Sequence, residues 1–384
     1  MFNKIIGQAV VDKIIEKRTN AADVKTSIVI NYFEVWAKFV KEANQKNGMK
    51  GLAYSEVFSN AGLDDINRDS SPISILRYAV EDSWLSQSLK TVFFDEKIDR
   101  IRQLKEEIQG LQQEKRLVHQ PKTYYSKADN VITQHLQFGK FVPSLFLMDP
   151  FSTKGLSKKM LLAMVRDWGC DIILFFNNNR FSKWLERKEK VWTIDNYLGN
   201  YLANNLRQML RGNIPREEAK SIVMKAFQQS LENIFGVNMV PFQFLSKKEP
   251  RINHHMFFLS RHFMHYHIMK EIMARASTRM DYGVPSMTYN PIDLTKLKKA
   301  ENTDKLTALE NDLTHYFRGK TLSVWSIYVK HSVGKPYTLQ NYKDALIQLE
   351  VDRRLKANPF VGNRPFRNGY STMANKTIIT FPAD

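Results

Sequence analysis

Short apolar segments alternate with amphipathic helical segments along the first half of the chain. The apolar positions predict strands at residues 51–58, 90–96, 122–125, 145–149 and 171–176. Apolar residues spaced three and four apart predict helices at 5–18, 26–44, 73–89, 97–116, 130–138 and 158–167. Strands that alternate with helices in this way are typical of a doubly wound parallel sheet, so the expected class is α/β and Rossmann-like.

The second half of the chain breaks this alternation. Residues 184–235 have a helical pattern with a break near Pro215, and they form a helical insertion before the last strands. Segments 242–245 and 256–259 would then complete the sheet as an antiparallel pair, before a Met-rich helix at 263–276. The predicted organisation is N-terminal helices in 1–50, an α/β domain in 51–280, a turn-rich linker in 281–302 and a separate domain in 303–384.

The last domain is basic. Residues 318–376 hold eleven Lys and Arg but three Asp and Glu. Helices at 303–317, 322–332 and 339–350, a loop at 358–376 and a strand at 376–381 follow the order of a winged helix. We expect five side chains to contact nucleic-acid phosphates: Arg353, Arg354, Lys356, Arg364 and Arg367. A winged helix that contacts protein is the alternative.

The composition indicates which class of partner and which cellular compartment to expect. The 384 residues carry a formal net charge of +18, which favours a polyanionic partner, nucleic acid before an acidic membrane surface. The one cysteine, Cys170, excludes an internal disulfide and any multi-cysteine metal site. The N-terminus is interrupted by charge, and no apolar stretch is long enough to span a membrane. We therefore expect a soluble protein in the cytoplasm.

Polar side chains recur where the expected strands end. They are Asn60, Asp95, Glu96, Asp129, Asp149 and Asn177. In an open α/β sheet, ligands bind beyond the carboxyl ends of the strands, so this recurrence predicts one shared crevice. Asp149 is followed by Pro150, which cannot extend a strand, although an acid here could also cap the next helix.

The loop after the first strand indicates which class of cofactor the protein could bind. Gly62 is the only glycine in residues 58–69, and acidic residues follow it at 64, 65 and 69. Negative charge would repel a phosphate-bearing cofactor but not a cationic sulfonium; an ordinary acidic surface loop is the alternative. After the second strand, Asp95 or Glu96 could accept the hydroxyls of a ribose, or could cap the helix that follows.

A dense group of histidines lies between residues 254 and 267. Its members are His254, His255, His262, His265 and His267. No cysteine, aspartate or glutamate interleaves with them, so core or surface histidines are favoured over a metal site, and we expect no metal.

The order of several loose motifs resembles the three-Cys-motif partner protein (TcmP) family over roughly residues 25–381. The motifs are Lys25-Thr26 with Tyr32 and Trp36, residues 54–62, Ser71-Pro72, Phe94-Asp95-Glu96, residues 147–151 with Gly155-Leu156, Tyr337-Thr338 and residues 378–381. This resemblance implies a methyltransferase-type fold with S-adenosylmethionine as cofactor, and a three-Cys-motif protein as a partner.

The resemblance also implies roles for particular residues. Phe58, Asn60 and Gly62 would form the cofactor loop, Asp95 or Glu96 would bind ribose, and Asp129 would contact the adenine edge. Asp149, Pro150 and Phe151 are similar to the Asp-Pro-Pro-Tyr motif with which amino-methyltransferases hold a target amine.

Three functions follow from these patterns. The first is an S-adenosylmethionine-dependent methyltransferase that acts on amino groups of nucleic acid, with the target base out of its stack. The second is a catalytically degenerate nucleic-acid-binding protein on the same fold, working with a partner in phage defence or a mobile element. The third is an adaptor whose winged helix contacts only protein.

Overall fold

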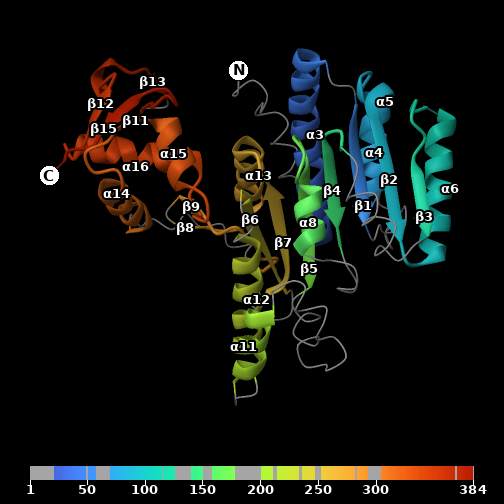
Figure 1. The fold of residues 1–384 in the computed structure, drawn as a ribbon. Coiled ribbons are helices and arrows are strands. Elements are labelled where there is room, and N and C mark those ends of the chain that lie inside the picture. The colour runs from blue at the N-terminus through green and yellow to red at the C-terminus, as the bar shows by residue number, and fades with distance from the viewer. Residues whose placement is uncertain are drawn as a thin grey trace. The chain divides into compact units, whose positions relative to one another are not determined.

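The structure is a computed structural model that divides into two units, residues 1–272 and 273–384 (Figure 1). It describes residues 21–48, 51–57, 70–114, 116–125, 140–149, 158–177, 200–210, 214–232, 236–246, 252–281, 283–292, 304–367 and 370–383.

The first unit is built on a large, mostly parallel sheet. Its parallel strands are β1 (Leu52–Val57), β2 (Leu89–Asp95), β3 (Lys122–Tyr125), β4 (Ser144–Met148) and β5 (Asp171–Asn177). Strand β7 (Ile252–Ser260) runs antiparallel to β5, and β6 (Asn238–Leu245) runs antiparallel to β7. The order in this unit is β6-β7-β5-β4-β1-β2-β3. The predicted doubly wound sheet and its antiparallel pair are thereby confirmed, and the order reverses between β1 and β4.

The helices of this unit follow the expected pattern with one interruption. They are α3 (Ala21–Asn47), α4 (Ser71–Glu81), α5 (Leu85–Ser88), α6 (Ile98–Glu114), α8 (Lys158–Met164), α11 (Asn200–Leu210), α12 (Arg216–Glu232) and α13 (Phe263–Ala276). The single helix expected at 73–89 is divided, because Asp82 Oδ1 accepts the backbone N–H groups of Trp84 and Leu85 at 2.9 and 2.8 Å and ends α4. The helices expected at 5–18 and 130–138 lie outside the described residues.

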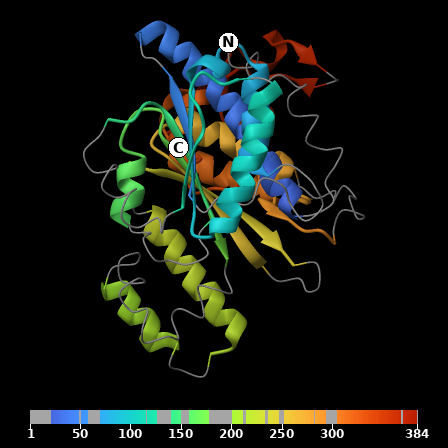
Figure 2. The ribbon, with the colours of Figure 1, turned by 90° about the vertical axis from the view of Figure 1, so that its right-hand side faces the viewer.

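Both faces of the central strands are covered, which explains why they lack polar alternation. All five residues of β4 are buried. On one face, Phe33 of α3 packs edge-on against Tyr54 of β1, with ring centroids 5.6 Å apart. On the other face, Phe227 of α12 stacks on Phe176 of β5 at 4.4 Å. Helices α11 and α12, between β5 and β6 in the chain, pack partly on this face and also reach beyond the ends of the strands (Figure 2).

The second unit contains a winged helix, as predicted. Its elements are α14 (Asp304–Tyr316), β11 (Thr321–Ser323), α15 (Val324–His331), α16 (Leu339–Val351), β12 (Lys356–Asn358), the 3-10 turn η3 (Val361–Asn363), β13 (Phe366–Arg367), β14 (Tyr370–Ser371) and β15 (Ile378–Thr380). Strands β11, β15 and β12 form an antiparallel sheet in that order. The helix expected at 322–332 begins at Val324, because Thr321–Ser323 pair with β15 and Ser323 Oγ caps α15.

The segment predicted to be a linker carries regular structure. It contains the two-residue strands β8 (Met280–Asp281), β9 (Val284–Pro285) and β10 (Thr288–Tyr289), and β8 pairs with β9. Asn341, near the start of α16, donates to the carbonyl oxygen of Gly283 at 2.7 Å. This hydrogen bond ties the β8–β9 hairpin to the winged helix within the second unit.

Candidate active site at the carboxyl ends of the strands

Asp149 lies at the point where the sheet order reverses. It directly follows β4, and its backbone N–H donates to the carbonyl oxygen of Val57, the last residue of β1, at 3.3 Å. Its carboxylate accepts a hydrogen bond from Lys25 Nζ at 2.5 Å. The same ammonium lies 3.9 Å from the ring centroid of Phe175 on β5.

A carboxylate and an aromatic face therefore hold one nitrogen between them. The Lys25 side chain is 14% exposed and that of Asp149 is 33% exposed, so the pair is partly desolvated but open to solvent on the Asp149 side. A carboxylate with an aromatic ring is a favourable environment for an ammonium or an amine. The sequence predicted the acid but not Lys25, which lies 124 residues away in the chain.

Glu56 is a second carboxyl group at this edge, and the sequence reasoning did not include it. It is 3% exposed and accepts a hydrogen bond from Tyr54 Oη at 2.5 Å. Burial raises the pKa of Glu56 from its ordinary value of 4.5 to about 7, against the lowering effects of Tyr54, Ser71 and Lys25. The sequence does contain a feature that could have identified Glu56: it is an acid inside an apolar strand, one residue before the strand end where a ligand would be expected.

The raised pKa of Glu56 predicts that stability depends on pH. The folded chain keeps this proton between pH 4.5 and about 7, whereas the unfolded chain releases it, so the free energy of unfolding should fall over that range as pH rises. The loss is about 3 kcal/mol by pH 8. The Glu56→Gln variant should lack this pH-dependent loss in the free energy of unfolding and should be more stable than the unaltered protein at pH 8. Urea unfolding at pH 5 and pH 8 would measure the difference. The same pH dependence in both proteins would contradict this assignment.

The two acids after β2 lie in different environments. Asp95 is 2% exposed; its Oδ1 accepts the backbone N–H of Lys97 at 2.7 Å, and its Oδ2 lies 3.6 Å from Arg100 Nη1. Burial raises the pKa of Asp95, although Lys97 and Arg100 act in the opposite direction. Asp95 thus stabilises the start of α6. Glu96 is half-buried, and no hydrogen bond or ion pair joins it to another described residue.

The five basic residues expected at a nucleic-acid interface also differ from one another. Arg353, Arg354 and Lys356 are exposed at the end of α16 and the start of β12. Arg364 is instead buried, with its side chain 2% exposed, and it forms an ion pair with Glu350. Arg367 lies in β13, and its side chain is outside the described part of the structure.

The remaining site predictions lie outside the described residues. They are Phe58, Asn60, Gly62, Asp129, Pro150 and Phe151. The predicted cofactor loop and the two residues after Asp149 therefore stay predictions.

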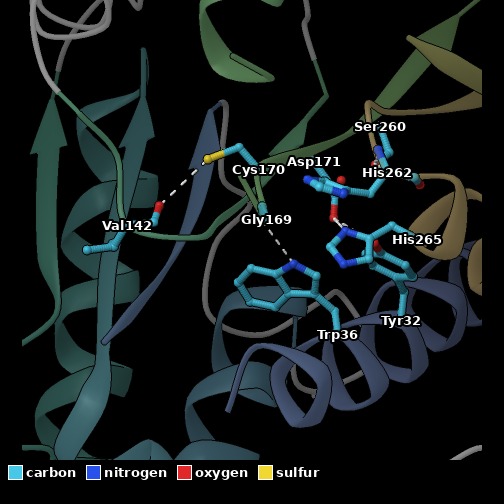
Figure 3. Close-up of polar contacts among 9 residues, drawn as sticks. All are labelled: Tyr32, Trp36, Val142, Gly169, Cys170, Asp171, Ser260, His262 and His265. Atoms are coloured by element: carbon cyan, nitrogen blue, oxygen red, sulfur yellow. Dashed lines mark hydrogen bonds and ion pairs between the residues drawn. The ribbon is translucent and has the colours of Figure 1, made fainter. Parts of the chain in front are cut away.

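Two of the histidines, His262 and His265, lie at the end of β5 opposite to Asp149 (Figure 3). His254 and His255 lie instead at the carboxyl end of β5, where they pair with Asn177 and Phe176. Asp171 begins β5 and is fully buried; its Oδ2 accepts from Tyr32 Oη at 2.7 Å and lies 2.8 Å from His265 Nδ1. Trp36 Nε1 donates to the carbonyl oxygen of Gly169 nearby, at 3.1 Å. These bonds join α3, β5 and α13 and serve the packing of the unit. Across the described part of the chain, no three potential metal ligands group together.

The sheet order gives a mixed, mostly parallel α/β fold, and the chain also contains a winged helix-turn-helix domain. Residues 292–359 match the family model described as the GMT-like wHTH domain. No curated protein matches the chain. None of the described helices is long and apolar enough to cross a membrane.

Several solved structures are similar to the chain at low identity. The O-methyltransferase from Bacillus cereus in complex with SAH is 10% identical over 67% of this chain and 94% of that chain, with a TM-score of 0.29. The O-methyltransferase TomG from Streptomyces achromogenes, in complex with SAM, is 9% identical over 67% and 93%, with a TM-score of 0.34. A dimethyladenosine transferase from Plasmodium falciparum is 9% identical over 82% and 87%, with a TM-score of 0.26. Identities and TM-scores this low do not indicate the substrate or the cofactor of this chain.

Proposed function

We propose that this protein is an S-adenosylmethionine-dependent methyltransferase that acts on an amino group of nucleic acid. The observation that carries the proposal is the nitrogen of Lys25, held between Asp149 Oδ2 and the ring of Phe175 at the end of β4. Lys25 occupies the kind of environment that a target amine requires, at the edge of the sheet where ligands bind.

The described acids fit the adenosine part of such a cofactor. Glu96 follows β2, where a carboxylate can accept both hydroxyls of a ribose. It is the better candidate of the two neighbouring acids, because Asp95 is buried and engaged with Lys97 and Arg100. When bound, the cofactor supplies a methyl group carried on a sulfonium.

Asp149 then orients the substrate. Its Oδ2 accepts a hydrogen bond from the amine, in the place of Lys25, and directs the nitrogen lone pair away from the carboxylate. Phe175 covers one side of the nitrogen, and we assign Phe151 to stacking on the target base. The exposed cations Arg353, Arg354 and Lys356 would contact phosphates. A three-Cys-motif protein is the proposed partner, and phage defence is the proposed setting.

A second function is favoured by the same contact. Lys25 fills the position beside Asp149, and Gly62 is the only glycine of the loop that would approach a cofactor. Both observations suit a nucleic-acid-binding protein that has kept the methyltransferase fold and lost the reaction.

Calorimetry with S-adenosylmethionine separates the two functions. We expect the protein to bind the cofactor and Glu96→Ala to weaken binding about 10- to 100-fold, because hydrogen bonds to a charged acceptor contribute about 1.5–3 kcal/mol. The matched variant Asp95→Ala should lower the melting temperature, because α6 loses its cap, whereas Glu96→Ala should not. If the unaltered protein does not bind the cofactor, the second function replaces the first.

A further inference from the structure

Phe360 is a large apolar side chain that is exposed, and one edge of its ring lies beside Gly362. It follows β12 at the start of the loop at 358–376, which is the wing of the winged helix, and 55% of it is exposed. One side of its ring lies against the backbone of Gly362, where a Cβ atom would be 2.7 Å from ring carbon Cε2. A side chain at position 362 would therefore force the ring or the turn to shift.

Buried polar contacts hold the turn that carries this ring. Glu350, near the end of α16, accepts the backbone N–H of Val361 at 2.9 Å through Oε1, and its Oε2 pairs with Arg364. The side chains of Glu350 and Arg364 are 8% and 2% exposed. The carbonyl oxygen of Phe360 accepts the N–H of Asn363 at 3.0 Å, which closes the turn. The backbone on the C-terminal side of Phe360 is thus fixed from inside the domain, while the ring is left at the surface.

The surroundings of the ring indicate what it contacts. Three exposed cations, Arg353, Arg354 and Lys356, precede it by four to seven residues in the chain, and Arg354 Nη2 donates to Asn311 Oδ1 at 3.0 Å. A second exposed aromatic, Phe366 at 66%, lies in β13. A rigid aromatic ring loses little conformational entropy when another flat ring stacks on it. Aromatic rings beside cations are how proteins bind unstacked nucleobases together with their phosphates.

We propose that Phe360 stacks on an unpaired base, so that the wing selects nucleic acid with a base outside a continuous duplex. Inside an intact duplex both faces of each base are covered by neighbours, so a phenyl ring finds no free face to stack on except at the duplex ends. A single strand, a bulge or an extruded base offers one. This inference rests on the proposed function only in taking nucleic acid as the partner, and it agrees with an amino-group reaction that needs the base out of its stack.

The test compares binding of the full-length protein to three sets of oligonucleotides at one salt concentration: duplexes, the same duplexes with one unpaired base, and single strands, each as DNA and RNA. Phe360→Ala should weaken binding to unpaired bases by about 10- to 100-fold and leave duplex affinity unchanged. Gly362→Ala keeps the phenyl ring but displaces it, so it should give a similar loss. Unaltered melting temperatures would show that both variants are folded.

Other outcomes overturn the inference in distinguishable ways. An equal loss on duplexes and unpaired bases, or no loss in either variant, removes the stacking role and leaves the nucleic-acid partner intact. If the unaltered protein binds none of these DNA or RNA oligonucleotides, both the inference and the proposed nucleic-acid substrate fail, while cofactor binding is judged by its own measurement. Loss of binding to a purified partner protein in Phe360→Ala, without any nucleic-acid binding, would assign the ring to a protein interface.

Discussion

Asp149→Asn should reduce methyl transfer at least about a hundredfold while S-adenosylmethionine affinity stays within a few-fold. The asparagine keeps the size of the side chain but loses the charge that holds a nitrogen at the end of β4. It can also present N–H groups that point at the amine instead of accepting from it, and misplacing a reacting group by about 1 Å costs this much in rate. Single-turnover transfer of labelled methyl to an oligonucleotide with an unpaired base would measure the change.

Lys25→Met is the matched control, because it removes the other half of the same ion pair. If Lys25 merely fills the place of the substrate amine, the methionine variant should bind substrate more tightly and show a lower KM without loss of kcat. If Lys25→Met loses as much activity as Asp149→Asn, the pair acts as a unit that holds α3 to the sheet, and Asp149 has no separate role in orienting the amine. Unchanged transfer in Asp149→Asn would remove Asp149 from the reaction altogether.

The strand ends could be predicted because they depend on local chemistry. The apolar residues 145–148 predict a buried strand that ends before Pro150, and β4 confirms that strand, with Asp149 directly after it. The same local reasoning left two alternatives at Asp95, a ribose contact or a helix cap. The structure shows Asp95 accepting the Lys97 N–H just before α6, and Glu96 as a ligand-binding acid stays a proposal.

The rest of the site depends on contacts between distant parts of the chain. Lys25 reaches Asp149 across 124 residues, and no spacing rule pairs an early helical lysine with one strand end. Glu56 takes its raised pKa from complete burial, which is a property of the packed sheet and not of the sequence around it. Arg364 looked like an exposed cation in a loop of glycine, proline and arginine, but its partner Glu350 lies on the neighbouring helix.

That buried pair gives the second large expected effect. Arg364→Met should destabilise the second unit by about 3–5 kcal/mol, because it leaves the Glu350 carboxylate buried without its counter-charge. The loss should be concentrated in the wing, since Glu350 also accepts the N–H of Val361. Hydrogen exchange of the amides of Val361, Asn363 and Arg364, followed by mass spectrometry, measures it locally. The first unit serves as an internal reference in the same experiment.

The double variant Glu350→Met with Arg364→Met separates a stability effect from a lost interface residue. Two apolar side chains of similar volume should recover most of the protection, less the hydrogen bond to Val361, which contributes about 1 kcal/mol. If the double variant regains protection and still binds unpaired bases, Arg364 acts by supporting the turn that carries Phe360. If it is folded but binds nucleic acid as poorly as Phe360→Ala, either Arg364 contacts the ligand directly or Glu350 is needed to orient the ring. A third variant, Glu350→Gln with Arg364→Met, decides between these, because it keeps an acceptor for the Val361 N–H and removes the guanidinium. Restored binding assigns the effect to Glu350 and the orientation of the ring, and binding as poor as in Phe360→Ala assigns it to Arg364.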